Sequence, residues 1–155
     1  MNLRIIWPGK TRDENLRRLQ EHYLGRIRRI GRCEIIETRE AKGIEDKDKD
    51  RILAVEAEGL EKQFKDDYII CLFDKGKEMT SLDLARFLEG HSTGSSRPLT
   101  FVVGGFVGLP GRILKRSDFL LSLSRMTFSH ELSRIILLEQ LYRSLTMIKG
   151  QHYAK

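Results

Sequence analysis

Residues 99–108 read LTFVVGGFVG, and residues 121–130 read LSLSRMTFSH. In the first segment a largely apolar run, 99–103, passes directly into a turn that holds three glycines. This run predicts a buried β-strand, and the apolar run 119–123 predicts another strand that leads into the second segment. Ligands of open α/β sheets bind at the carboxyl ends of the strands, so the two loops are predicted to meet in one pocket.

Apolar runs of strand length alternate with helical spacing along the rest of the chain. Strands are predicted at 3–7, 33–38, 68–73, 99–103 and 119–123. Helices are predicted over 15–30, through about 64 after a charged loop at 42–51, from Thr80 until a loop at 90–98, over 110–116 and over 129–148. This order is typical of an α/β protein with a mostly parallel sheet flanked by helices. A chain of 155 residues that is 40% hydrophobic is expected to form a single domain, 1–155.

The composition argues against membrane, disulfide-rich and metal-binding proteins. Charged residues make up 32% of the chain, no apolar run has the length of a membrane span, and the apolar stretch 3–7 is too short for a signal peptide. A soluble cytoplasmic protein without a membrane partner is therefore expected. Cys33 and Cys71 lie inside predicted strands, which indicates buried packing rather than a disulfide framework. The histidines share no ligand spacing with these cysteines, so no metal site is expected.

The net charge of +6 is unevenly distributed. Residues 1–32 carry nine Lys and Arg against three Asp and Glu, 33–96 carry ten against sixteen, and 97–155 carry nine against three. The two basic ends could form one face that attracts phosphates, although a solvated surface of mixed charge is an equally good interpretation. The densest basic stretch lies on the first predicted helix. The candidate RNA-binding residues are Lys10, Arg17, Arg18, Arg28 and Arg29.

The last predicted helix, 129–148, is apolar around more than one stripe. One sheet cannot cover two faces of a helix, and a chain of this length has little further core in which to bury the second face. The pattern therefore predicts burial against another copy of the chain, most simply in a twofold symmetric homodimer.

The glycine turn at 104–108 admits two interpretations. Glycine lets backbone amides approach a ligand closely and permits positive φ, which favours a binding loop. The spacing is not the Gly-x-Gly-x-x-Gly of a dinucleotide fold, and the turn follows the fourth strand rather than the first. A turn that serves only tight packing between strand and helix is equally compatible with the motif.

The segment 123–128 presents backbone donors and acceptors beside apolar side chains, as an adenine edge and ring require, although it could also be an ordinary connection. His130 follows at the start of a helix that Ser129 or Thr127 is expected to cap. The field at a helix N-terminus favours neutral imidazole, which can accept a proton. Taken alone, capping or packing explains His130 better than catalysis does. The same helix is expected to display three more polar side chains, Arg134, Glu139 and Arg143.

Several segments stand in one register along the chain. They are FVVGGFVGL at 101–109, LSLSRMTFSH at 121–130, LLEQLYR at 137–143 and a tyrosine near the end, Tyr153. Together with a third strand followed by Asp74, these segments resemble the large-subunit ribosomal RNA pseudouridine N3-methyltransferases, the RlmH family of the SPOUT superfamily. The resemblance extends over nearly the whole chain, and the full set in register is far more specific than any one segment.

The resemblance implies a SPOUT-type α/β fold with a trefoil knot near the C-terminus and a homodimer formed across the last helix. It implies S-adenosylmethionine as the cofactor, bent into the knotted loops. The implied reaction is methylation at N3 of a pseudouridine in a stem-loop of large-subunit (23S) ribosomal RNA, on the assembled ribosome. The residues that the resemblance places at the cofactor are Phe73, Gly104, Gly105, Gly108, Leu123, Ser124, Arg125, Met126, Thr127 and Phe128. Phe73 departs from the family, in which leucine is usual, but it keeps an apolar wall.

Methyl transfer to a ring nitrogen requires in-line positioning, exclusion of water and loss of the imide proton, but no metal. We assign His130 as the candidate base and Arg143 as the group that stabilises the anion, with Glu139 orienting them. Tyr153 keeps its family position in the tail and completes the candidate catalytic set.

The tail departs from the family after this tyrosine. Ala154 stands where the family usually has histidine. Any role of that histidine is either unfilled here or passes to His152, and the departure bears on the level of activity more than on the identity of the reaction.

Two other functions fit parts of the sequence. A non-catalytic, ribosome-associated binding protein would use the basic helix and keep the glycine turn for packing alone. A doubly wound nucleotide-binding enzyme would act on a small molecule in the same pocket. Binding of S-adenosylmethionine separates the methyltransferase from the first of these.

Overall fold

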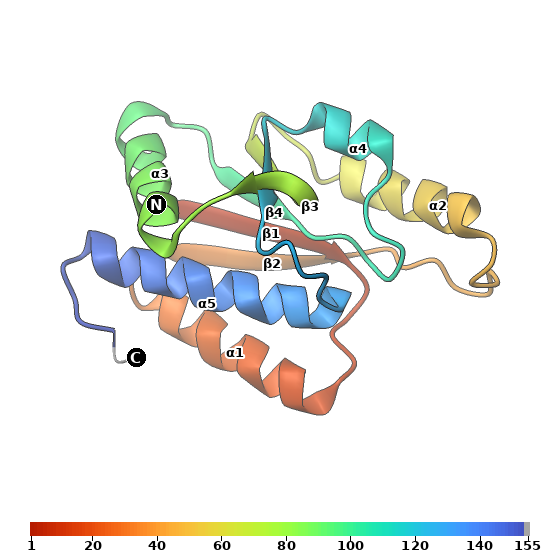
Figure 1. Cartoon of the computed structure of the whole chain (residues 1–155), viewed down its shortest axis with the longest axis horizontal. Coiled ribbons are helices and arrows are strands. Elements are labelled where there is room, and N and C mark those ends of the chain that lie inside the picture. The colour runs from red at the N-terminus through yellow and green to blue at the C-terminus, as the bar shows by residue number, and fades with distance from the viewer. Residues whose placement is uncertain (154–155) are drawn as a thin grey trace.

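The computed structural model describes residues 1–153, in which five strands alternate with five helices (Figure 1). The strands are β1 (Asn2–Pro8), β2 (Arg32–Thr38), β3 (Tyr68–Glu78), β4 (Leu99–Val102) and β5 (Phe119–Ser122). The helices are α1 (Glu14–Arg28), α2 (Lys49–Glu61), α3 (Ser81–Gly94), α4 (Gly111–Arg116) and α5 (His130–Ile148). The predicted alternation of strands and helices is confirmed.

All five strands run parallel in one sheet, in the order β2-β1-β4-β3-β5. β4 lies at the centre, where Phe101 pairs with Ile5 of β1 and with Ile70 of β3. Every residue of β4 is buried, as expected for a central parallel strand. The parallel arrangement collects the carboxyl ends of all five strands along one edge. The predicted parallel α/β sheet is therefore confirmed.

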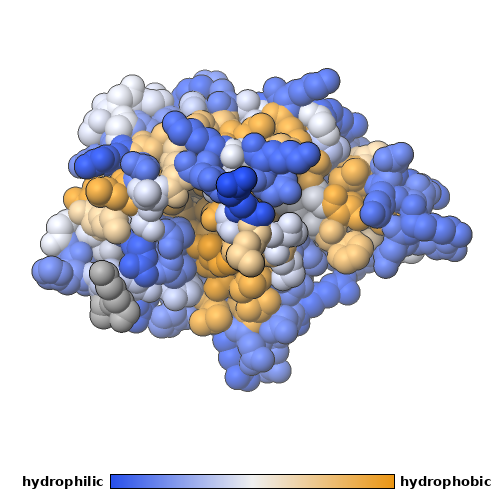
Figure 2. All heavy atoms as spheres, viewed as in Figure 1, coloured by the Kyte–Doolittle hydropathy of each residue, from blue (hydrophilic) through white to orange (hydrophobic). Residues whose placement is uncertain are grey.

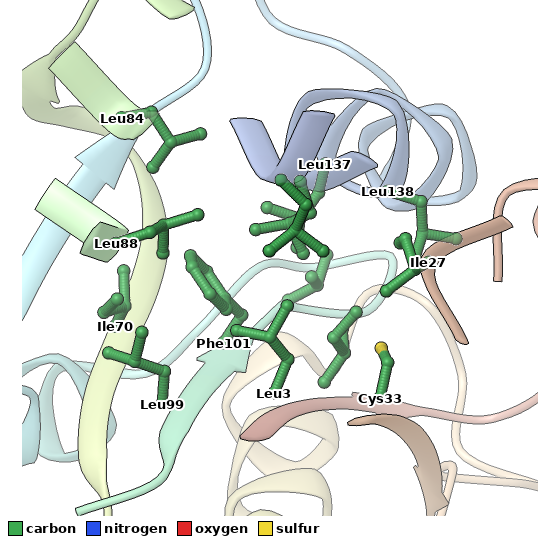
Figure 3. Close-up of a cluster of buried hydrophobic side chains, with 14 of the residues drawn as sticks. Leu3, Ile27, Cys33, Ile70, Leu84, Leu88, Leu99, Phe101, Leu137 and Leu138 are labelled. Atoms are coloured by element: carbon green, nitrogen blue, oxygen red, sulfur yellow. The ribbon is translucent and has the colours of Figure 1, made fainter. Parts of the chain in front are cut away.

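The helices cover both faces of the sheet, and the side chains of each strand alternate between those faces. On β1, Ile5 belongs to a core shared with α1, α3 and α5, whereas Ile6 packs with α2 and α4. Figure 3 shows the larger core, which includes Ile27 of α1, Leu88 of α3 and Leu137 of α5 together with Phe101 of β4. Burial of this apolar surface is the main stabilising contribution to the fold.

α5 lies between α1 and α3 on one face of the sheet (Figure 1). These two neighbours cover more of the helix than the sheet alone could, and Leu137, Leu138 and Leu141 are fully buried. Leu132 and Met147 stay 38% and 40% exposed. Much of the second apolar stripe is thus satisfied within one chain, and the homodimer stays a prediction.

β3 extends beyond its predicted end at Phe73 and continues to Glu78. Its pairing with β5 shifts on the way, because Leu72 and Lys77 both pair with Leu121. The residues between them leave the regular ladder, as in a β-bulge, which re-aims side chains next to many functional sites. The prediction that the strand ends before Asp74 is wrong, because an apolar run marks only the part of a strand that is covered on both faces.

α3 also extends further than predicted and runs to Gly94. The sequence predicted a loop over 90–98. Gly90 does not end the helix, because the next turn continues the helical bonding and the Thr93 hydroxyl donates to the carbonyl of Glu89 over 3.1 Å. The prediction of a loop from Gly90 is wrong at its first five positions.

Side-chain caps fix the starts of three helices. Thr80 and Asp83 form the predicted capping box of α3. Of the two candidates for α5, Ser129 is the cap, and its hydroxyl accepts from the backbone N–H of Leu132 over 3.3 Å. Asp13 caps α1 in the same way.

Cys33 and Cys71 are buried and free of disulfides, as predicted. Burial raises the pKa of each thiol to about 12, so both stay protonated at neutral pH. Among residues 1–153, no helix combines the length and the apolar character needed to cross a membrane.

Candidate active site

A cavity of about 510 Å³ opens at the carboxyl ends of β4 and β5, beside the start of the irregular part of β3. Residues 72–74, 103–109 and most of 123–130 line it, so the two loops that the sequence predicted to meet do meet here. The volume is in the usual range for small-molecule sites. The predicted cofactor-binding residues on its wall are Phe73, Gly104, Gly105, Gly108, Leu123, Ser124, Met126, Thr127 and Phe128, whereas Arg125 is not among the lining residues.

The irregular part of β3 is tied to the loop that precedes α5. The Ser122 hydroxyl lies 3.0 Å from the carbonyl oxygen of Asp74 and 3.1 Å from that of Ser124. Gly76 lets the two backbones approach, because a Cβ there would lie 2.7 Å from the carbonyl oxygen of Leu120. The bulge in β3 and the loop after β5 therefore form one wall.

The glycine turn forms the opposite wall. A Cβ on Gly104 would lie 2.6 Å from the carbonyl carbon of Gly108, so only glycine fits there without a backbone shift. Gly108 has φ +81°, and its N–H donates to the carbonyl of Gly105 over 3.0 Å. The turn is thus closed on itself, and at its glycines it presents bare backbone to the cavity.

The mouth of the cavity is apolar. Phe106 and Met126 project from opposite walls and are 69% and 76% exposed. Exposed apolar side chains that lie together at the edge of a cavity form the kind of patch that marks a ligand-binding groove or an interface. The cavity therefore has a rim suited to covering by a second surface.

His130 is the first residue of α5, and it lines the cavity. Burial lowers its pKa, and the positive charge of Arg134 lowers it further, against the opposing effects of Glu131 and Glu40. The imidazole is therefore neutral at pH 7 and can accept a proton. The sequence predicted this state from the helix N-terminus, whereas burial is the largest cause. The ring of Phe106 meets the imidazole edge-on, with 6.4 Å between centroids.

Arg134 is buried, which corrects the prediction that α5 displays it to solvent. Its guanidinium donates to the carbonyl of Pro8 over 2.8 Å and to the hydroxyl of Thr11 over 3.1 Å, and it lies 4.7 Å from the centroid of the Trp7 ring. Burial lowers its pKa to about 10, so it remains charged at neutral pH. A signal for its burial was present, because Arg134 precedes Leu137 and Leu138 by one helical turn and shares their face.

Glu56 of α2 lies behind the glycine turn, and no sequence pattern singled it out. A Cβ on Gly105 would lie 2.8 Å from the Glu56 Oε1 atom, so the two residues are in close contact. The carboxyl is 4% exposed, and its Oε2 atom has no hydrogen-bond partner among residues 1–153. Burial raises the pKa of Glu56 to about 7, and Glu40 adds to this, whereas Arg134 opposes it.

Glu139, Arg143 and Tyr153 form a separate cluster beside the C-terminal half of α5. The Arg143 guanidinium donates to the Glu139 carboxylate over 2.6 Å and lies 4.5 Å from the centroid of the Tyr153 ring. Glu139 lies about 13 Å further along the helix than His130, at about 1.5 Å per residue. One chain therefore does not bring these three residues to the cavity of His130. The departure at Ala154 lies outside the described residues.

The predicted RNA-binding residues divide between the two ends of α1. Lys10 and Arg17 line a second cavity at the carboxyl ends of β1 and β2. Arg28 and Arg29 lie at the opposite edge, beside the start of β1. Arg18 forms an exposed ion pair within the helix. These residues are spread along the length of α1 and do not meet in one cavity, and their role in RNA binding stays a prediction.

A parallel sheet whose carboxyl edge holds a glycine-walled, partly apolar cavity defines an α/β protein with a site for a nucleotide-like ligand. Among residues 1–153, no group of three or more His, Cys, Asp and Glu side chains is placed to hold a metal ion. The family model described as "Predicted SPOUT methyltransferase" matches residues 1–154. The chain belongs to this family and is a methyltransferase.

Relatives of similar length support the assignment. The chain is 41% identical over 154 residues to a protein of Geobacter metallireducens, with 99% of this chain and 98% of the relative covered. It is 37% identical over 158 residues to a protein of Geotalea daltonii, with 99% of each covered. Both relatives are named ribosomal RNA large subunit methyltransferase H.

Two solved structures show the same fold. A Haemophilus influenzae protein described as a methylase family member gives a TM-score of 0.58 at 12% identity, covering 99% of this chain and 70% of that one. A Legionella pneumophila protein described as a methyltransferase, with bound S-adenosylmethionine, gives 0.51 at 11% identity, covering 91% and 65%. At these identities the likeness concerns the fold alone.

Replacement of Gly104 by alanine is expected to destabilise the protein by roughly 1–3 kcal/mol, because the added Cβ meets rigid backbone. Gly90→Ala is the matched control, since a Cβ there meets nothing within 4 Å and helix interiors favour alanine by roughly 0.5–1 kcal/mol. Urea denaturation of both variants measures the difference. Equal stability of Gly104→Ala and the parent would mean that the turn can open without cost.

The stabilising contribution of Glu56 is expected to be present at low pH and lost as the pH rises. Its folded pKa of about 7 exceeds the ordinary value of 4.5, so the folded state holds the proton more tightly. The contribution is complete below about pH 4.5 and disappears as the pH passes about 7. The free energy of unfolding of Glu56→Gln, relative to that of the parent, should therefore rise by up to roughly 3 kcal/mol between pH 4 and pH 8.

Urea titrations at both pH values measure this change. Glu58→Gln is the control, because Glu58 is exposed on the same helix and its one ion pair within residues 1–153 is with Lys62. A difference between Glu56→Gln and the parent that does not change with pH would contradict the buried, protonated carboxyl.

Proposed function

We propose that this chain uses S-adenosylmethionine to methylate N3 of a pseudouridine in a stem-loop of 23S ribosomal RNA, on the assembled ribosome in the cytoplasm. The observation that carries the proposal is the cavity built jointly by the glycine turn and the segment 123–128. Further support comes from the relatives named ribosomal RNA large subunit methyltransferase H and from the fold neighbour with bound S-adenosylmethionine. The C-terminal trefoil knot and the single domain over 1–155 belong to the same proposal.

The cavity fits this cofactor in shape and charge. Bare backbone at Gly104 and Gly105 allows hydrogen bonds to an adenine edge, and Phe73 and Val103 supply apolar contact for its ring. No lysine or arginine is among the lining residues, so a positive sulfonium would meet no like charge on the wall. Bound S-adenosylmethionine supplies an electrophilic methyl group.

The protein's own residues then position the target base and manage its proton. The imide N–H of the base must lose its proton for the ring nitrogen to attack. Neutral His130, on the cavity wall, is placed to accept that proton. Phe106 and Met126 at the mouth exclude water when a second surface covers them, which strengthens electrostatic interactions inside.

The proposal includes a homodimer formed across α5. In a twofold symmetric pair with antiparallel α5 helices, the far end of one helix faces the near end of the other. Glu139, Arg143 and Tyr153 of the partner subunit would then approach the cavity that their own chain does not reach. Exposed apolar side chains on α5 favour such pairing, and Figure 2 shows apolar surface over the middle of the molecule, where α5 crosses the view.

Two measurements test the proposed function. Calorimetry with S-adenosylhomocysteine should give micromolar binding, and absence of binding would favour a non-catalytic binding protein. Mass spectrometry of 23S ribosomal RNA from a strain that lacks the gene should show one missing methyl group, restored by the parent gene. Binding of the ligand with an unchanged RNA would point to another substrate.

Replacement of His130 by alanine is expected to lower turnover by about 10²–10⁴-fold, as for loss of a general base. The affinity for S-adenosylhomocysteine should change much less. Because the pKa of His130 is lowered from its ordinary value of 6.5, the rate of the parent should begin to decrease only at a pH below 6.5. His22→Ala, on the exposed surface of α1, is the control. Equal losses in turnover and in ligand affinity would reassign His130 to binding.

A further inference from the structure

A second cavity, of about 870 Å³, opens on the same edge of the sheet, at the carboxyl ends of β1 and β2. The loop that follows β1 forms one wall, and residues 37–42 after β2 form the other. Five cationic and two anionic side chains line this basic cleft. They are Lys10, Arg12, Arg17, Arg39 and Lys42, against Glu37 and Glu40.

The two carboxylates leave most of this positive charge uncompensated. Glu40 is engaged by Arg12, whose guanidinium lies 2.7 Å from it. Lys10, Arg39 and Lys42 are exposed and form no ion pair with any side chain of residues 1–153. Exposed cations on both walls of a cleft focus a positive potential inside it.

The walls of the basic cleft are held in place by the backbone. Gly9 has φ +71°, and its N–H donates to the carbonyl of Thr38 over 3.0 Å, which joins the two walls at their base. The carboxylate of Glu131 accepts the backbone N–H groups of Arg12 and Asp13 at 3.0 to 3.1 Å. Arg17 donates to the carbonyl of Thr11 over 2.6 Å. The cleft is therefore preformed rather than dependent on a ligand for its shape.

The basic cleft and the candidate active site are neighbours. β1, which ends at the cleft, pairs with β4, which ends at the glycine turn, and adjacent strands lie about 4.8 Å apart. Glu131, which holds the cleft loop, directly follows His130 on α5. A polyanion bound in the cleft would thus lie close to the cavity in which methyl transfer is proposed.

We propose that the basic cleft binds phosphate groups of the RNA strand next to the target nucleotide. Phosphate contacts position an RNA without reading its sequence, which leaves base selection to the cavity. The proposal rests on the function proposed above for the neighbouring site. It places the RNA-binding surface at the carboxyl ends of β1 and β2 rather than along α1.

A second basic surface lies at the opposite edge of the sheet, away from the candidate active site. Arg28, Arg29 and Arg32 cluster beside the first residues of β1. α1 has 15 residues, which corresponds to about 22 Å between its ends. An RNA held by these arginines would lie a full strand length away from the cavity of His130.

The test compares two double variants that each remove two positive charges. Lys10→Ala/Arg39→Ala removes two of the five cations of the basic cleft, and Arg29→Ala/Arg32→Ala removes two of the three cations of the remote cluster. Binding of a 12-nucleotide single-stranded RNA of mixed sequence is followed by fluorescence anisotropy between about 0.05 and 0.2 M salt. The cleft variant should bind about tenfold more weakly and lower the salt slope of the logarithmic affinity by one to two, whereas the remote variant should match the parent.

Affinity for S-adenosylhomocysteine and methyl transfer to ribosomes are measured on the same proteins. Unchanged ligand affinity in the cleft variant shows that the fold and the cavity are intact. Equal losses of RNA binding in both variants, loss only in the remote variant, or no loss in either would overturn the proposal. Loss of ribosome binding with full binding to the oligonucleotide would also overturn it, in favour of a ribosomal protein as the partner.

The two levels of the proposal can fail separately. One outcome is that the parent neither binds S-adenosylhomocysteine nor transfers methyl groups, while only the cleft variant loses affinity for the RNA. This outcome would support the basic cleft as an RNA-binding site and contradict the proposed reaction. If methyl transfer is robust and the cleft variant retains both its RNA affinity and its kcat/KM on ribosomes, the reaction stands and the cleft falls.

Discussion

The buried guanidinium of Arg134 joins the parts of this molecule that are proposed to act together. It comes from α5, one turn after His130, and it bonds to the end of β1 at Pro8 and to the cleft loop at Thr11. Burying a guanidinium is costly unless it is paired and hydrogen-bonded. Here the negative charges of Glu131, Glu37 and Glu40, and that of Glu56 when it is ionised, help to keep it charged, although burial still lowers its pKa. The positions of α5, the first loop and the glycine turn are therefore not independent of one another.

This constraint explains how one sheet edge can carry two kinds of surface. The ends of β4 and β5 and the start of the irregular part of β3 meet the apolar, glycine-walled cavity, whereas the ends of β1 and β2 meet the basic cleft. Glu131 belongs to both halves, because its backbone continues from His130 and its carboxylate holds Arg12 and Asp13. A parallel sheet makes such a division natural, since every strand delivers its following loop to the same edge.

The sequence predicted features that depend on local pattern and failed where long-range contacts decide. The alternation of strands and helices, the capping box at Thr80 and the meeting of the two loops follow from periodicity and turn residues, and they are confirmed. The bulge in β3 is invisible in composition, because it arises from pairing with β5. Glu56 looks like one more charge on an amphipathic helix until the fold places it against Gly105. The burial of Arg134 was readable from its spacing to Leu137, but a charged residue on an apolar stripe was interpreted as displayed.

The case for a second subunit also changes once the fold is known. The apolarity of α5 is a weaker argument than its sequence suggests, because α1 and α3 cover much of the helix within one chain. The polar cluster of Glu139, Arg143 and Tyr153 is a stronger argument for a dimer. Arg143 is held by Glu139 and stacked on Tyr153, and none of the three lines the cavity of His130 in the same chain. In the proposed dimer, an isologous pairing of α5 with its copy would bring that arrangement toward the cavity of the partner subunit. The proposed dimer is therefore supported more by the distance between His130 and Arg143, if both take part in the proposed reaction, than by the need to bury apolar surface.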